Sequence, residues 1–328
     1  MDWTANVAVH ESASPEFLRE QILSALHQGR VHPHLLYSGL RQTGLWIALH
    51  HAFSPAKQDA RCREMYDAAF TCSSQNIRGN VAHLVSLACG DGTKDVRCLE
   101  RIRASARATL YTPVDLSFEM VLAASRTATT TLRGLQSTPL VCDLAHCSVL
   151  PAILKGFDPS GAERLLLFLG TLHNYWPPEI LRSILYPLRS QDQLLMSANL
   201  VPAETSEASL REVLKQYDNE PTRLWLMGAL SELGLSQLDG ELKIEIGQSS
   251  LPTLKRIEAN FRLTSERQIQ IYEQKVDLKR GQELSVFYSH RFTLAHLRDF
   301  FAQAGLKISD TWIGADGYEG LFLCKRAQ

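Results

Sequence analysis

One stretch of the chain, VAHLVSLACGDGTKD at residues 81–95, decides the fold class. Its first eight residues form a short apolar run rich in β-forming residues, which predicts a buried strand over residues 81–88. Residues 94–106 have the character of a helix, and Gly90 and Gly92 lie between the two segments. A strand, a glycine turn and a helix in this order begin an α/β unit.

The same alternation continues on both sides of this unit. Ser14 and Pro15 begin a predicted helix that ends at Gly29, and Pro55 begins a polar helix that reaches about Asn76. Downstream, helices are predicted at residues 116–131 and 178–188, and strands at residues 108–114, 140–143, 164–169 and 193–201. Strands that alternate with helices indicate a parallel, doubly wound sheet.

The sequence changes character after about residue 204. Residues 207–234 are charged and helical, and alternating apolar residues at 242–246 and 268–272 predict antiparallel strands outside the parallel sheet. An amphipathic helix at 293–304 and strands at 306–313 and 320–325 complete the chain. We therefore expect an α/β, Rossmann-like domain made of residues 56–202 and 286–328. Residues 1–55 and 203–285 are expected to form an added substrate-binding domain.

Composition and charge limit the classes of partner. The 328 residues include 34 Lys and Arg against 35 Asp and Glu, a formal net charge of -1, and no long run of one sign occurs. Capture of nucleic acid or of an anionic membrane is not favoured, so the expected partners are small molecules or other proteins. The seven cysteines lack C-x-x-C spacing, so we expect neither a disulfide framework nor a metal site. No secretory signal and no 18-residue apolar run is found, which predicts a cytoplasmic protein.

The glycine turn and two aspartates predict a cofactor that contains adenosine. Gly90 and Gly92 permit close approach of the backbone, and the helix that follows favours a carboxylate at its N-terminus. Asp115 ends the second strand, where an acid commonly binds the ribose hydroxyls, and Asp143 ends the third, where it can accept from an adenine amine. The alternative is an ordinary strand-to-helix connection with aspartates that cap turns.

Several motifs extend this pattern: LACGDGTK at 87–94, YTPVDLS at 111–117, FLGTLHN at 168–174, SANLV at 197–201, AGL at 304–306, and Trp312, Gly317-Tyr318 and LFL at 321–323. Together they resemble the histidine-specific, S-adenosylmethionine-dependent N-methyltransferase family of ergothioneine biosynthesis, whose fungal relatives methylate dimethylallyltryptophan. The resemblance covers the chain from about Tyr37 to Lys325. It implies a class I methyltransferase sheet and S-adenosylmethionine as cofactor.

The resemblance also implies roles for individual residues. Gly90 and Gly92 would lie against the methionine moiety of the cofactor, Asp115 would hold the ribose and Asp143 would face the adenine. Asn174 matches an asparagine that holds the amino and carboxylate end of the substrate, and Tyr37 matches a tyrosine that closes the substrate pocket. The predicted cofactor-binding set is Gly90, Asp91, Gly92, Lys94, Asp115, Ser117 and Asp143.

Two departures from the family concern the methyl acceptor. Phe53 stands where the family has a tyrosine that contacts the substrate, and Phe287 stands where it has a glutamate, whereas Ser289 keeps the family's serine. A buried imidazole N–H that loses its acceptor costs about 1–3 kcal/mol. We therefore expect the acceptor to be an amino acid or an amino-acid-derived amine other than histidine, in a more aromatic pocket. Tyr288 and Trp225 are further candidates for that pocket, although core packing is the common role of such residues.

Methyl transfer from a sulfonium is an in-line displacement that depends on the position of a neutral nucleophile. Asn174 and Tyr37 are expected to position the amine. His173 is a candidate proton acceptor, with a structural role as the alternative. Two other functions stay open at this point: a cofactor-binding protein without transfer activity, and transfer to oxygen or to a guanidine nitrogen. The oligomeric state is not predicted.

Overall fold

The strand predicted over residues 81–88 is β2 (Val81–Leu87) and lies in the middle of a large, mostly parallel sheet. The computed structural model describes residues 3–105, 108–158, 162–201, 207–251 and 253–327. The strand order is β1 (Ala8–Val9), β5 (Leu140–Val141), β3 (Ala108–Asp115), β2 (Val81–Leu87), β6 (Glu163–Phe168), β7 (Gln193–Asn199), β14 (Glu319–Arg326) and β13 (Leu306–Ile313), with β4 (Gln136–Ser137) beside β3. β2 pairs in parallel with β3 and β6, and β14 runs antiparallel between β7 and β13, so the Rossmann-like α/β fold class is confirmed.

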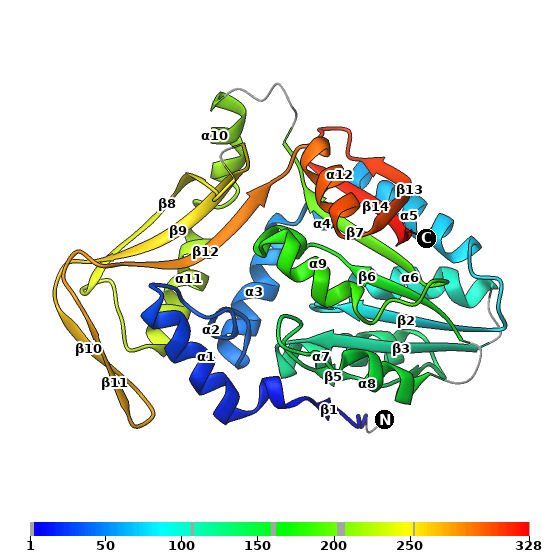
Figure 1. Ribbon diagram of the computed structural model, residues 1–328, viewed down its shortest axis with the longest axis horizontal. Coiled ribbons are helices and arrows are strands. Elements are labelled where there is room, and N and C mark those ends of the chain that lie inside the picture. The colour runs from blue at the N-terminus through cyan, green and yellow to red at the C-terminus, as the bar shows by residue number, and fades with distance from the viewer. Residues whose placement is uncertain (1–2, 106–107, 159–161, 202–206, 252, 328) are drawn as a thin grey trace.

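Helices cover both faces of this sheet (Figure 1). The helices form two groups, one on each face of the sheet. The apolar side chains of each group pack against its own face, so the two faces carry separate apolar clusters. The central strands are therefore buried on both sides, which explains why β2 and β6 are continuous apolar runs. The first group is α5 (Ala60–Gln75), α6 (Thr93–Ser105) and α7 (Phe118–Thr131), and the second is α8 (Leu150–Phe157), α9 (Pro177–Leu185) and α12 (Leu294–Gln303).

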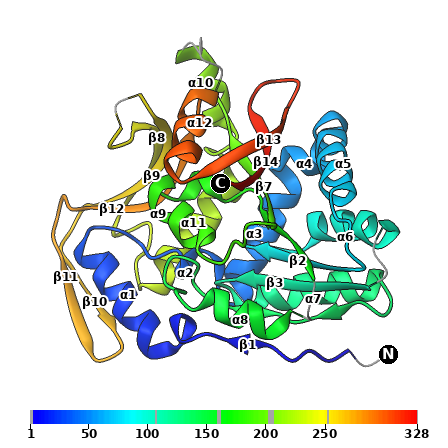
Figure 2. The ribbon, with the colours of Figure 1, turned by 45° about the vertical axis from the view of Figure 1, so that its right-hand side comes forward.

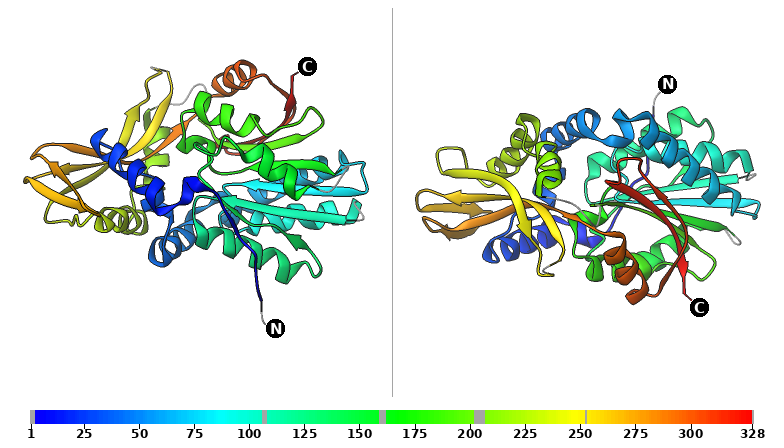
Figure 3. Two further views of the ribbon diagram at one scale, coloured as in Figure 1. Left: turned by 60° about the horizontal axis from the view of Figure 1, so that its bottom comes forward. Right: turned by 90° about the horizontal axis from the view of Figure 1, so that it is seen from above.

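A second sheet lies at the other end of the molecule (Figure 3). It is antiparallel, in the order β12 (Glu283–Arg291), β9 (Lys255–Leu263) and β8 (Gly240–Gln248). A hairpin of β10 (Arg267–Ile271) and β11 (Gln274–Leu278) projects beyond it (Figure 2). The apolar cluster of this half also includes α1 (Pro15–His27), α2 (His34–Tyr37), α3 (Leu40–Phe53), α10 (Glu207–Lys215) and α11 (Glu220–Glu232). The short helices η1 (Glu11–Ala13), α4 (Pro55–Gln58) and η2 (Leu172–Asn174) connect longer elements.

Several predicted elements differ in their limits. The charged helix expected over 207–234 is divided into α10 and α11, because Asn219 caps a new helix with its side chain and a proline follows in the first turn. The strand expected over 140–143 ends at Val141, since Asp143 accepts a hydrogen bond from the backbone of Ala145 and begins a turn. Residue 106, the expected end of the helix over 94–106, lies outside the described residues, as do residues 202 and 203 at one predicted domain boundary.

Strand β12 belongs to the second sheet and also reaches the large one. Its residues 287–291 pair with β9, so the predicted domain boundary between residues 285 and 286 falls inside this strand. Directly after β12, Phe292 exchanges backbone hydrogen bonds with Asn199 and Val201 at the end of β7. A register shift between Ser285 and Phe287 bulges the strand, and bulges redirect the side chains beside them.

The glycine turn yields a prediction about stability. A Cβ at Gly92 would come within 2.7 Å of the Cα of Ala124 in α7, and Gly92 has φ +72°, so Gly92→Ala meets both a backbone clash and strain. We expect a loss of about 2–4 kcal/mol in the free energy of unfolding, measured by urea denaturation. Gly134→Ala is the matched control, because Gly134 has φ +75° with open space around it and should lose only about 1 kcal/mol. Equal losses in the two variants would contradict the close contact.

Candidate functional site

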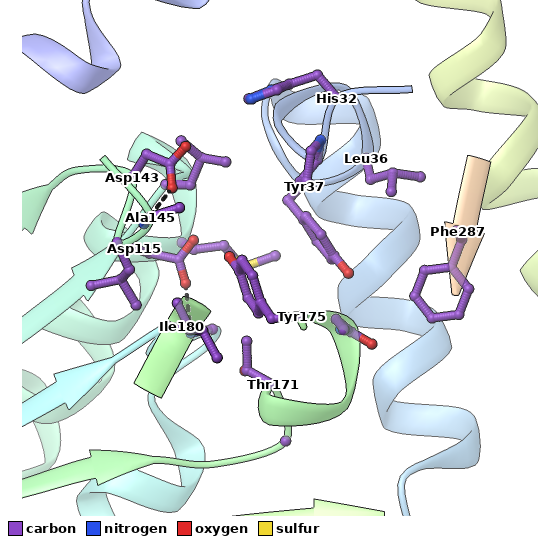
Figure 4. A pocket seen from close by; sticks show the side chains of 18 of the residues that line it. His32, Leu36, Tyr37, Asp115, Asp143, Ala145, Thr171, Tyr175, Ile180 and Phe287 are labelled. Atoms are coloured by element: carbon purple, nitrogen blue, oxygen red, sulfur yellow. Dashed lines mark hydrogen bonds between the residues drawn. The ribbon is translucent and has the colours of Figure 1, made fainter. Parts of the chain in front are cut away.

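A cavity of about 820 Å³ lies where the carboxyl ends of the parallel strands face the second half of the molecule. The glycine turn and the residues after β3, β5 and β6 line one side, and α1 to α3 and residues 285–288 of β12 line the other. Figure 4 shows Asp115 and Asp143 on the first side, and Tyr37 and Phe287 across from them. This position at the strand ends is where α/β sheets bind their ligands.

Asp115 is anchored by the backbone around it. Its carboxylate accepts hydrogen bonds from the backbone N–H groups of Gly90 at 3.2 Å and Ser117 at 3.0 Å. Burial nevertheless raises the pKa of Asp115 to about 6, against the lowering effect of these bonds. Gly90 itself is covered by Trp46, since a Cβ there would lie 3.1 Å from the indole ring. The side of the carboxylate that faces the cavity can therefore accept hydroxyl donors from a ligand.

Asp143 lines the same side of the cavity and is held in a turn. Its carboxylate accepts from the backbone N–H of Ala145 and from Nδ1 of His146, each at 2.9 Å. Burial opposes ionisation of Asp143, but the bonds to His146 and Ala145 prevail and its pKa is lowered. The backbone N–H of Asp143 donates to Ser12, which ties the turn to the N-terminal segment.

Asp91 and Lys94 also line the cavity. The Asp91 carboxylate accepts from Nζ of Lys57 at 2.6 Å and from the backbone of Thr93, and these bonds outweigh burial and lower its pKa. Lys94 Nζ donates to the hydroxyl of Tyr66 at 3.3 Å and lies 4.8 Å from the centroid of that ring. Lys94 is thus a cation on the cavity wall, and both of these contacts join it to the uncharged side chain of Tyr66.

Two residues of the predicted cofactor set do not line the cavity. Gly92 packs against Ala124, so its missing side chain serves the contact between the turn and α7. Ser117 is buried and caps α7, with its hydroxyl accepting from the backbone of Met120 and donating to Glu119. Both residues support the turn and the strand end rather than a ligand.

Tyr37 and Phe287 line the side of the cavity that faces the strand ends, and Asn174 of η2 lines the cavity among the residues that follow β6. The rings of Tyr37 and Phe287 each lie 5.5 Å from that of Trp225, which holds them in one aromatic group. Burial, followed by the charge of Asp115, raises the pKa of Tyr37, so this phenol stays protonated. Oδ1 of Asn174 is buried and has no hydrogen-bond partner among the described residues. It is the type of acceptor that a bound N–H group would satisfy.

The structure does not place His173, Ser289 or Phe53 on the cavity wall. His173 is buried, and burial, followed by the positive charge of Arg291, lowers its pKa well below the ordinary value. Ser289 is fully buried beside Tyr217, with 3.1 Å between the hydroxyls. Phe53 is 40% exposed at the end of α3.

Sequence reasoning missed other residues that line the cavity, notably Trp46, Tyr175 and Trp176. Tyr175 directly follows Asn174, and its ring appears between Asp115 and Tyr37 in Figure 4. The position of Tyr175 beside the FLGTLHN motif was a usable signal. The sequence around Trp46 gave no such signal, because α3 contains no recognisable motif. The position of Trp46 over the glycine turn depends on the packing of segments that are distant in the sequence.

The described part of the chain contains neither a cluster of metal-binding side chains nor a helix suited to cross a membrane. No cluster of His, Cys, Asp or Glu there is arranged to hold a metal ion, and no helix in that part is both long and apolar enough to cross a membrane. The cysteines that the structure describes are free thiols.

Comparison with known proteins identifies one family. The model of a family described as histidine-specific, S-adenosylmethionine-dependent methyltransferases matches residues 64–326. A search of curated protein sequences found no match.

Solved structures of other methyltransferases are similar at low identity. They include magnesium protoporphyrin IX methyltransferase of Synechocystis PCC 6803 with bound S-adenosylhomocysteine (13% identity, 89% of this chain and 97% of that chain, TM-score 0.48). OxaC in complex with S-adenosylhomocysteine and oxaline matches at 12% identity over 94% of this chain and 62% of that one, with a TM-score of 0.49. The 1,6-didemethyltoxoflavin-N1-methyltransferase of Burkholderia thailandensis is 14% identical over 89% of this chain and 93% of that chain, with a TM-score of 0.38.

The pKa of Asp115 predicts a pH dependence of stability. The pKa of Asp115 is about 6 in the folded protein and 3.8 ordinarily. Between pH 3.8 and 6 the carboxyl group is therefore protonated in the folded state and ionised in the unfolded state. The resulting stabilisation is complete below about pH 4 and is lost as the pH rises through 6. The free energy of unfolding of the wild type minus that of Asp115→Asn should fall by about 1–3 kcal/mol between about pH 4 and 7 in urea denaturation. The histidines are common to both proteins, so a constant difference would contradict the assignment.

Proposed function

Because the chain belongs to the family of histidine-specific, S-adenosylmethionine-dependent methyltransferases, we propose that it methylates the amino group of an amino acid or amino-acid-derived small molecule other than histidine. The observation that carries this proposal is the position of Phe287, a residue without a hydrogen-bond acceptor in its side chain, on the cavity wall. Its phenyl ring stands on the cavity wall and packs edge-on against Trp225.

The cavity residues fit S-adenosylmethionine. The ribose hydroxyls would donate to Asp115, whose carboxylate is fixed by backbone donors and whose pKa is raised by burial. The adenine amine would face Asp143, and Lys94 would attract the methionine carboxylate. When bound, the cofactor supplies an electrophilic methyl group on a sulfonium. In this arrangement Gly92 and Ser117 would not contact the cofactor but would hold the glycine turn and the start of α7 in place.

The acceptor side favours an apolar or aromatic side chain. Tyr37, Phe287 and Trp225 form a continuous aromatic contact, and Phe287 offers no acceptor to an imidazole N–H. Specificity that depends on a hydrogen bond is lost when one partner is removed, so the site should bind histidine poorly. Ser289, which keeps the family's serine, is occupied by Tyr217 and Asn199.

Asn174 is the residue that we assign to the amine. Its unpartnered Oδ1 would accept from the amino group and direct the nitrogen lone pair toward the methyl carbon. Bound S-adenosylmethionine would supply the methyl carbon to this lone pair, the electron pair of the sulfur–carbon bond would stay on sulfur, and the methylated ammonium and S-adenosylhomocysteine would be the products. Tyr37 stays protonated and orients the substrate, and His173 is a structural residue in this assignment.

We also propose that the two halves of the molecule bind different ligands. Residues 56–202 and 286–328 would bind the cofactor, and residues 1–55 and 203–285 would bind the acceptor. The N-terminal segment supports this division because Gly29 and Val31 exchange backbone hydrogen bonds with Ser285. Since β12 continues across residue 286, its residues 286–288 contribute to the acceptor side as well.

The function is tested with purified protein and S-adenosylmethionine. L-histidine, L-tryptophan, L-arginine and their derivatives are each incubated with the protein, and products are identified by mass spectrometry. Calorimetry with S-adenosylhomocysteine is run on the same preparation. A methylated amine other than histidine supports the proposal. Methylation of histidine alone, methylation on oxygen, or binding without any product contradicts it.

Asn174→Ala should separate transfer from cofactor binding. Loss of the amide removes the acceptor that positions the amine, so kcat should fall by about 100-fold or more. The affinity for S-adenosylhomocysteine in calorimetry should stay within about twofold, because the residues that we assign to the cofactor are Asp115, Asp143 and Lys94. A large loss of cofactor affinity would place Asn174 in the cofactor site instead.

Phe287→Gln should shift specificity toward histidine. The amide oxygen restores an acceptor for an imidazole N–H, so kcat/KM for L-histidine should rise by about 10-fold over the wild type. Phe287→Leu is the control, because it removes the ring without adding an acceptor and should bring no gain. An equal rise in both variants would show that space, rather than hydrogen bonding, excludes histidine.

A further inference from the structure

His32 lies in the connection between α1 and α2 and lines the cavity from the side that faces the strand ends. Only 7% of its surface is exposed. Its Nδ1 accepts a hydrogen bond from the backbone N–H of His34, at the start of α2, over 3.3 Å. Burial lowers the pKa of His32 to about 4, so near pH 7 the imidazole is neutral and carries a single proton on its two nitrogens.

The hydrogen bond from His34 fixes the position of that proton. A ring nitrogen that accepts a hydrogen bond holds no proton, so in the neutral imidazole of His32 the proton is on Nε2. No described residue accepts a hydrogen bond from this Nε2. His32 therefore presents to the cavity an N–H donor that a bound ligand can satisfy.

The donor of His32 and the carboxylate of Asp143 lie at the same end of the cavity. In Figure 4 the imidazole of His32 extends toward the side that carries Asp143. The two groups are near enough for each charge to act on the other: Asp143 opposes the burial that lowers the pKa of His32, and His32 contributes to the lowered pKa of Asp143. A hydrogen-bond donor and a hydrogen-bond acceptor thus face the same part of the cavity from opposite walls.

Asp143 keeps acceptor positions free for a ligand. Its carboxylate accepts from the backbone N–H of Ala145 and from Nδ1 of His146, each at 2.9 Å. An ionised carboxylate has about four acceptor positions, so about two remain. The bonds from Ala145 and His146 also hold the carboxylate in a fixed orientation on the cavity wall.

A donor beside an acceptor is complementary to one edge of adenine. The exocyclic amine of adenine donates, and the ring nitrogens on either side of it, N1 and N7, accept. In DNA-binding proteins a single Asn or Gln amide recognises this edge with one donor and one acceptor. Guanine and hypoxanthine carry an oxygen in place of the amine, and a carboxylate at that position would repel it.

We propose that His32 donates from Nε2 to the adenine ring nitrogen beside the amine that Asp143 accepts, so that the two residues together select adenine. This inference rests on the proposed position of the adenine beside Asp143. It assigns a cofactor contact to residues 1–55, which otherwise serve the acceptor. His32 would bind the cofactor and take no part in the displacement at the methyl carbon.

Two amide variants separate the roles of the two nitrogens of His32. The amide of Gln reaches the position of Nε2 and that of Asn only the position of Nδ1, so H32Q keeps a donor toward the cavity and H32N keeps the contact with His34. In calorimetry with S-adenosylhomocysteine, H32N should bind about 10-fold more weakly than the wild type, and H32Q should stay within about threefold. Equal affinities of the wild type and H32N overturn the inference, as does an equal loss in both variants.

Analogues of S-adenosylhomocysteine identify the atom to which His32 donates. Two analogues are used, with carbon in place of N1 or in place of N7. The wild type should bind one of them about 10-fold more weakly than S-adenosylhomocysteine, and this difference should disappear in H32N. Each comparison is made within one variant, so a change in its stability does not alter the ratio. A preference that persists in H32N, or its absence from the wild type, shows that the inference is wrong.

Asp143→Asn tests the position of the adenine on which the inference rests. An Asn retains an oxygen for the turn but removes the ionised acceptor, so the affinity for S-adenosylhomocysteine should fall by about 10-fold. Unchanged affinity in D143N overturns both the position of the adenine and the role of His32. Weakened binding in D143N with unchanged binding in H32N overturns the role of His32 alone. These measurements use no methyl acceptor, so they do not depend on which amine is methylated.

Discussion

The contact between Gly92 and α7 is the constraint on which the rest of the site depends. Only a residue without a side chain lets the turn after β2 lie against Ala124. This contact joins the first strand–helix unit to the second and brings the backbone N–H of Gly90 to the carboxylate of Asp115. The acid that ends β3 is thereby fixed by the turn that follows β2, before any ligand is present. Preorganised groups of this kind bind ligands with little loss of conformational freedom.

A second constraint is the path of β12. The strand hydrogen bonds to β9 in the small sheet, and Phe292 then hydrogen bonds to the end of β7 in the large one. The bulge between Ser285 and Phe287 occurs in the part of the strand that faces the cavity. The wall that we propose for the acceptor is therefore built on regular structure attached to the large sheet, and Phe287 on it is held in place by Trp225 and Tyr217.

The fold was largely predictable because its signals are local. The apolar run at 81–87, the glycine turn after it and the alternation of strands and helices specify a Rossmann-like sheet, and the family match agrees with it. Asp115 and Asp143 line one cavity, as their positions at strand ends predicted, and Asn174, which only the family resemblance singled out, lines it too. By contrast, the helix cap at Ser117, the packing of Gly92 and the buried position of Ser289 depend on contacts between distant segments. A motif records the residue type at such positions, but it does not distinguish a residue that contacts a ligand from one that supports it.

The two walls of the cavity are made from different parts of the chain. The wall that we propose for the cofactor comes from the ends of the parallel strands, and the wall that we propose for the acceptor comes from α1 to α3 and β12. A substitution at residue 287 changes the acceptor wall and leaves the anchoring of Asp115 by Gly90 and Ser117 unaltered. Acceptor choice in this architecture can therefore diverge by single substitutions while selection continues to preserve cofactor binding.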